Sequence, residues 1–196
     1  MSLLILGLVL FLGVHSVRIF ADGWRSRVIA ARGQSVWKGL YAALALAGFV
    51  LIVWGYGAAR QQPVVLWATP GWTRHAAALL SLVAFLLLVA AYVPGNAIKA
   101  MVKHPMVLAV KVWAIAHLIA NNTLADVVLF GAFLLWAVLD FRSARQRDRA
   151  AGTVYPPGRV VPTVIAVVIG LVAYAGFAFW AHRAWIGVSP FVRGGA

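Results

Sequence analysis

Residues 3–20 read LLILGLVLFLGVHSVRIF, a run in which Arg18 is the single charged side chain. A helix needs roughly 20 apolar residues to cross a bilayer hydrocarbon core of about 30 Å. The run meets that length, and it lacks both a basic segment before it and a small-residue cleavage site after it. We therefore expect a retained membrane span here, and not a signal peptide that is removed.

Five further apolar runs follow along the 196-residue chain, separated by turn signals such as the pair Asn121-Asn122. Pro105 suits the first turn of a helix, because its missing N–H costs nothing there. Thr123 with Asp126 fits a capping box that opens another helix. We predict an all-α polytopic transmembrane helix bundle of about six spans. The predicted single domain covers residues 1–196, with spans at about 3–20, 36–59, 75–93, 105–120, 123–140 and 161–185.

The composition fits a membrane protein better than a soluble one, because 64% of the residues are hydrophobic. Lys and Arg together number 17 against four acidic residues, a basic excess that could also suit nucleic acid. These basic residues lie in short clusters between apolar runs, however, which is typical of membrane flanks. We therefore expect membrane lipid as a partner and no nucleic acid. The absence of cysteine excludes disulfides, thiolate metal sites and cysteine nucleophiles.

The distribution of Lys and Arg predicts the orientation of the chain in the membrane, because basic loops stay on the cytoplasmic side. The connections after the first, third and fifth runs hold most of the basic residues, whereas the tail holds Arg183 and Arg193. We expect a bacterial inner membrane protein with both termini in the periplasm. The basic clusters comprise Arg25, Arg27, Arg32 and Lys38, then Lys99, Lys103 and His104, and finally Arg142, Arg145, Arg147 and Arg149.

Ionisable residues inside predicted spans are functional candidates by default. His15 and His117 lie two or three turns from the ends of separate helices, and two such imidazoles suit the axial positions of a haem iron. Arg18 follows His15 by less than a turn and could pair with a haem propionate, as could Lys111 or Lys103. The residues alone leave a second interpretation open, in which each histidine forms a hydrogen bond to a neighbouring helix.

Other chemistry has less support in the sequence. Trp113, His117 and Asn121 share a helix face at a spacing of four residues. The chain has no Glu, and its Asp residues lie at predicted span ends or in loops, which argues against a carboxylate proton relay. Hydrolase and phosphate-binding motifs are absent, and no histidine spacing supports a zinc or copper site. No inverted repeat with broken helices indicates a transporter.

Three segments strongly resemble the NnrU family, and the resemblance covers essentially the whole chain. They are LGVHSVR at residues 12–18, KHPM at 103–106 continuing through KVWAIAHL at 111–118 to Asn121, and HRAWIGVSP at 182–190. The resemblance implies a bacterial inner membrane protein linked to the reduction of nitrite and nitric oxide in denitrification.

The same pattern resembles 15-cis-ζ-carotene isomerase of plants and cyanobacteria, a relative that is an integral membrane enzyme with haem b. That likeness implies His15 and His117 as the axial ligands, with His104 as a competing candidate for one position. The plant enzyme has a cysteine three residues before the second histidine, and this chain has Ala114 there. A switch from histidine to thiolate ligation is therefore excluded in this chain.

These observations predict a membrane protein that binds haem b through two histidines and uses it for redox or nitric oxide chemistry. Two alternatives stay open at this point. One is a haem-dependent cis–trans isomerase of a lipid-soluble, carotenoid-like polyene. The other is a non-catalytic membrane partner or assembly factor in which the histidines are structural. The sequence does not settle whether the protein is an enzyme.

Overall fold

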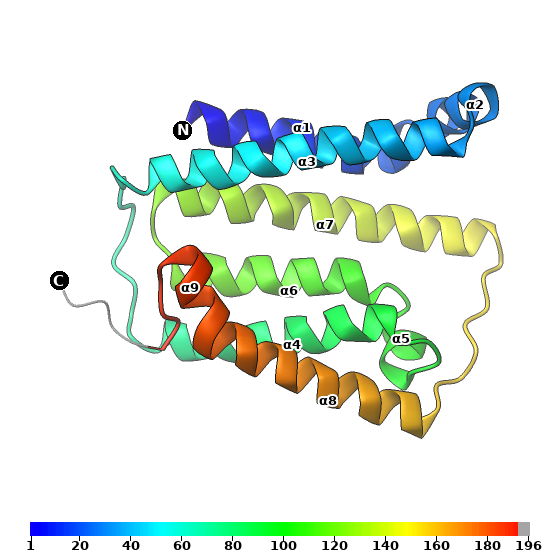
Figure 1. The fold of residues 1–196 in the computed structure, drawn as a ribbon. Coiled ribbons are helices and arrows are strands. Elements are labelled where there is room, and N and C mark those ends of the chain that lie inside the picture. The colour runs from blue at the N-terminus through cyan, green and yellow to red at the C-terminus, as the bar shows by residue number, and fades with distance from the viewer. Residues whose placement is uncertain (192–196) are drawn as a thin grey trace. The chain divides into compact units, whose positions relative to one another are not determined.

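The computed structural model describes residues 1–191, which fold into helices without a named β-strand among them (Figure 1). This confirms the all-α prediction, while Arg193 of the tail lies outside the described residues. The helices are α1 (Ser2–Phe20), α2 (Asp22–Arg32), α3 (Gln34–Ala59), α4 (Thr73–Tyr92), α5 (Ala97–Val102), α6 (Pro105–Ala120), α7 (Leu124–Ala150), α8 (Val160–Gly176), the π-helical turn η1 (Phe177–Ala181) and α9 (His182–Ile186).

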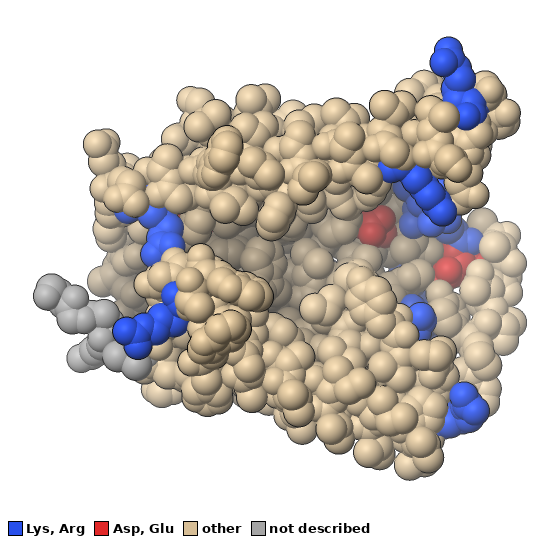
Figure 2. Space-filling model, viewed as in Figure 1, with Lys and Arg blue, Asp and Glu red and all other residues tan. Residues whose placement is uncertain are grey.

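The protein is a multi-pass membrane protein, because five of its helical segments are long and apolar enough to cross a bilayer. They are α1, α3, α4, α7 and the continuous segment Val160–Ile186. Helix α6 is shorter, with 16 residues, and accounts for the sixth predicted span. In Figure 2 the surface over α1 and α3 carries neither Lys nor Arg between its ends, as expected for a face in contact with lipid.

The chain forms two compact units. The first unit contains residues 1–67 and 122–143, and the second unit contains residues 68–121 and those from 144 onward. The prediction of one domain over residues 1–196 stays a prediction.

Glycines allow α1 and α3 of the first unit to pack with their backbones in close approach. A Cβ atom added to Gly7 would lie 2.6 Å from the backbone N of Ile52, and one added to Gly48 would lie 2.7 Å from that of Phe11. Helices in membranes commonly associate through such small residues, because lipid leaves little hydrophobic force between them. The pairing of early α1 with late α3 shows that the two helices are antiparallel.

Helix α7 begins in the first unit at the predicted capping box. The backbone N–H of Thr123 donates to Oδ2 of Asp126 (3.0 Å), and the N–H of Asp126 donates back to Oγ1 of Thr123 (3.3 Å). Asp126 also accepts a hydrogen bond from the hydroxyl of Tyr56 on α3 (2.5 Å). The N–H of Leu124 donates to the carbonyl of Val64 (2.9 Å) in the loop that follows α3. These bonds attach the start of α7 to the end of α3.

In the second unit α4 packs against both α6 and α8. Tyr174 of α8 donates to the carbonyl of Ala78 on α4 (3.0 Å). Asn96, which is 1% exposed, caps α5 by accepting a hydrogen bond from the N–H of Lys99 (2.8 Å). Pro105 occupies the first turn of α6, as predicted. These contacts fix the helix that carries His117.

The structure adds helical segments that the sequence did not indicate. Residues 22–32 form α2 where a polar connection was expected, and Asp22 in its first turn favours a helix N-terminus. Helix α7 continues beyond the predicted span end at residue 140, because its Arg-rich extension consists of good helix formers and reaches Ala150. The sixth predicted span contains the π-helical turn η1 before α9.

Candidate functional site

His15 lies on α1, and its ring is held by the helix that carries it. Its Nδ1 lies 2.6 Å from the carbonyl oxygen of Phe11, one turn earlier. A carbonyl can only accept, so Nδ1 carries a proton, and in the neutral form of the ring the lone pair would be on Nε2. The ring also stacks on that of Phe11, with centroids 4.2 Å apart. His15 is therefore oriented with an electron pair available for a metal ion or a proton.

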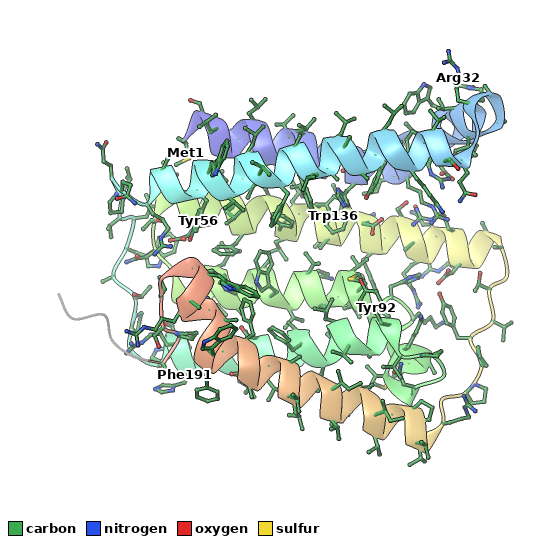
Figure 3. The ribbon with its side chains drawn as sticks, in the orientation of Figure 1. Met1, Arg32, Tyr56, Tyr92, Trp136 and Phe191 are labelled. Atoms are coloured by element: carbon green, nitrogen blue, oxygen red, sulfur yellow. The ribbon has the colours of Figure 1, made fainter. Side chains whose placement is uncertain are left out.

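Aromatic side chains from three helices of the first unit surround this ring. The centroid of the Tyr41 ring on α3 is 5.1 Å from that of His15, and the centroid of the Trp136 ring on α7 is 6.0 Å away, edge-on. Phe133 on α7 contacts Phe11 with centroids 5.8 Å apart. We name Phe11, His15, Tyr41, Phe133 and Trp136 the His15 aromatic cluster; Figure 3 labels Trp136. The imidazole of His15 is therefore surrounded by the flat, largely apolar faces and edges of aromatic rings.

The indole N–H of Trp136 is buried and has no hydrogen-bond partner. Among the described residues 1–191, it is the single buried side-chain nitrogen or oxygen atom without a hydrogen-bond partner. Leaving a buried donor unsatisfied costs about 1–3 kcal/mol. Such a group in a native bundle calls for an acceptor, and it lies beside His15.

Basic side chains lie at the same end of the first unit as His15. Arg18 follows His15 by three residues on α1, and Lys38 precedes Tyr41 by three residues on the antiparallel α3. Arg142 lies six residues after Trp136 on α7, which runs in the same direction as α1. Arg18 is exposed. These cations could neutralise the carboxylates of a ligand bound beside His15.

His117 has the same local arrangement in the second unit. Its Nδ1 donates to the carbonyl oxygen of Trp113, one turn earlier on α6 (2.8 Å), and the ring centroids of the two residues are 5.1 Å apart. The side chain of Asn121 in turn donates to the backbone carbonyl of His117 (2.8 Å). Lys111 lies half-buried on the same helix. In the neutral form of this ring the lone pair would be on Nε2, as in His15.

His104 differs from these two histidines because a carboxylate holds its Nε2. That nitrogen donates to Oδ2 of Asp148 (2.7 Å), which also accepts from the hydroxyl of Tyr155 (2.9 Å). The ammonium of Lys103 lies 5.7 Å from the centroid of the Tyr155 ring. Burial raises the pKa of Tyr155, and the hydrogen bond to Asp148 and the negative charge of Asp148 raise it further. The cluster joins the start of α6 to the end of α7.

The structure places the predicted site residues in both units. His15 and Arg18 belong to the first unit, whereas His104, Lys111, Trp113 and His117 belong to the second. The pairing of His15 with His117 on one cofactor stays a prediction. Among residues 1–191 no group of three or more His, Asp or Glu side chains is arranged to hold a metal ion.

Four residues around the candidate histidines were missed from the sequence. Tyr41 and Trp136 resemble any other aromatic residue of an apolar span, so nothing in the sequence singles them out. Asp148 could have been noticed, because it is the one acid within an Arg-rich run. Tyr155 lies in a loop whose path sequence patterns do not determine.

A family model described as NnrU protein matches residues 3–190, nearly the whole chain. Neither the curated proteins nor the solved structures include one that matches.

Proposed function

The chain belongs to the NnrU protein family, and we propose that it is an integral membrane haem b protein with His15 and His117 as the axial ligands of the iron. One observation carries this proposal. Both histidines donate Nδ1–H to the carbonyl four residues earlier and so keep the lone pair on Nε2. Metal-ligating histidines almost always donate their other ring N–H to such an acceptor, which fixes the ring and raises its basicity.

The residues around His15 fit a haem in other respects. Aromatic rings of the His15 aromatic cluster offer flat apolar surfaces for a porphyrin. The unsatisfied indole N–H of Trp136 needs an acceptor. Arg18, Lys38 and Arg142 supply positive charge for two propionates at the same end of the unit. A porphyrin with an apolar ring and anionic edge matches this combination.

His117 is favoured over His104 as the second ligand. Coordination through Nε2 of His104 would require that nitrogen to leave the carboxylate of Asp148, 2.7 Å away. His117 is already oriented by the bond from its Nδ1–H to the carbonyl of Trp113, as His15 is by its bond to Phe11. Lys111 and Lys103 are further candidates to pair with a propionate.

The proposed role is to support the reduction of nitrite or nitric oxide in denitrification, the process to which the NnrU resemblance points. Haem held by the two histidines would supply one-electron chemistry, with nitric oxide as a candidate ligand. The protein's own contribution is to hold the imidazoles in one tautomer and to exclude water with apolar side chains. Basic residues at the inner end keep the carboxylates of the cofactor bound.

The test is to measure the haem content and spectrum of three histidine variants of the purified protein. His15→Ala and His117→Ala should each lose haem or change the spin state of the iron. His182→Ala is the matched control, because His182 also donates Nδ1–H to a carbonyl, that of Val188 (2.7 Å), but is not a proposed ligand. An unchanged spectrum in His117→Ala alone would indicate that His104, and not His117, is the second ligand. Unchanged spectra in both variants would reject the proposed ligation.

A further inference from the structure

Trp136 carries a hydrogen-bond donor that its own protein does not satisfy. Its Nε1 is buried without an acceptor, in a membrane bundle where water cannot easily replace one. Polar N–H groups of this kind are costly and are normally paired. The folded protein therefore lacks an acceptor that a bound molecule can provide.

The position of Trp136 indicates which molecule this is. Its ring stands edge-on to that of His15, at an interplanar angle of 89° and a centroid distance of 6.0 Å. Trp136 therefore lies beside the imidazole, within reach of a ligand bound at His15.

Charge determines the chemical class of the acceptor. Arg18, Lys38 and Arg142 come from three different helices and lie toward the same end of the first unit as His15. Asp140 on α7 adds one negative charge that acts on Tyr41, but three cations against one carboxylate still favour an anionic acceptor. A hydrogen bond to an ionised oxygen is about twice as strong as one between neutral groups. A polyene hydrocarbon has no acceptor atom and would leave the indole N–H unsatisfied.

We infer that the indole N–H of Trp136 donates a hydrogen bond to a propionate carboxylate of haem, which makes Trp136 a positioning residue for the cofactor. This inference rests on the proposed function, because it requires haem at His15. The hydrogen bond would hold a propionate of the bound cofactor at Trp136. It also satisfies the donor that the protein alone leaves without an acceptor.

The experiment compares the dissociation constants of ferric haem and its dimethyl ester, for the wild type and Trp136→Phe. Esterification removes the negative charge of the propionates, and phenylalanine removes the N–H while keeping an aromatic ring. The wild type should prefer haem, and Trp136→Phe should reduce that preference by about tenfold, as expected for a bond to a charged group. Because each ratio comes from a single protein, the packing change cancels. The control Trp54→Phe, at a tryptophan that is 67% exposed on α3, should leave the ratio unchanged.

The outcomes separate this inference from the proposed function. If the wild type binds neither porphyrin, the haem assignment fails and the inference fails with it. If haem binds through His15 but Trp136→Phe keeps the wild-type ratio, the role of Trp136 alone is rejected. Should Trp136→Phe not fold, nitrogen-15 indole spectra of the wild type with diamagnetic gallium protoporphyrin IX replace it. One indole N–H should then shift downfield with the free acid and not with the ester, and identical spectra would overturn the inference.

Discussion

At the residue scale, the account depends on which ring nitrogen each histidine presents. His15 and His117 each donate Nδ1–H to their own helix, whereas His104 donates Nε2–H to Asp148. This difference separates two candidate ligands, His15 and His117, from His104, which is the partner of a carboxylate. A histidine of the latter kind should contribute to stability without holding the cofactor.

His104→Ala should therefore retain haem with an unchanged spectrum and lower the melting temperature of the protein. The variant removes the donor that joins α6 to Asp148 near the end of α7, so the carboxylate loses a charge-assisted hydrogen bond. Optical spectra and thermal unfolding in detergent measure the two effects. His75→Ala is a control, at a histidine with no assigned role. Loss of haem in His104→Ala with full retention in His117→Ala would reverse the ligand assignment.

At the element scale, the helices are held by contacts between particular backbone segments. In α3, Gly55 faces the backbone of Leu4 on α1, whereas a Cβ atom added to Gly57 would meet nothing within 4 Å. The two glycines are two residues apart in sequence and therefore lie on different faces of the helix. One is required by packing, and the other is not.

Gly55→Ala should destabilise the protein by about 1–3 kcal/mol, because the new methyl group overlaps the backbone of Leu4. Gly57→Ala is the matched control and should be neutral or stabilising, since alanine is the better helix former. Unfolding of both variants in the same detergent gives the comparison. Equal stabilities would show that α1 and α3 do not pack through Gly55.

The start of α7 gives a second prediction at this scale. Thr123→Ala removes the hydroxyl that caps the helix and accepts from the N–H of Asp126, so it should lower stability by about 1 kcal/mol. Thr153→Ala, at an exposed threonine beyond the end of α7, should change stability much less. If the two substitutions had the same effect, the capping box would contribute nothing measurable.

The sequence predicted the helices that rest on long apolar runs and on turn signals, including the capping box of Thr123 and Asp126. It did not predict α2, because residues 22–32 are short, polar and contain Gly23; in the structure α2 packs against α1 and α3. Nor did it predict the environment of His15. Which aromatic residues surround that ring depends on the rotation of α3 and α7 about their axes, and apolar runs that face lipid do not encode this rotation.

At the scale of the whole molecule, the orientation in the membrane follows from where the basic residues lie. In Figure 2 basic side chains project at α2, which connects α1 to α3 in the chain. The positive-inside rule predicts that the basic connections lie in the cytoplasm and the start of α1 in the periplasm, and this orientation stays a prediction.

The chain has no cysteine, so single cysteine substitutions report this topology without background. Ser2→Cys, at the start of α1, should react with a membrane-impermeant maleimide in intact spheroplasts. Ser26→Cys, exposed on α2, should react only after the membrane is permeabilised. The opposite labelling pattern would show that the chain has the opposite orientation, with its basic connections outside the cytoplasm.

The most direct test of the central claim is the pyridine haemochrome spectrum of the purified, full-length protein. The account predicts a red protein with the bands of haem b in an amount stoichiometric with the chain. The two imidazoles with their lone pairs on Nε2 would also give a low-spin iron whose Soret band shifts on reduction. A folded protein that stays colourless after haem supplementation during expression would contradict the account.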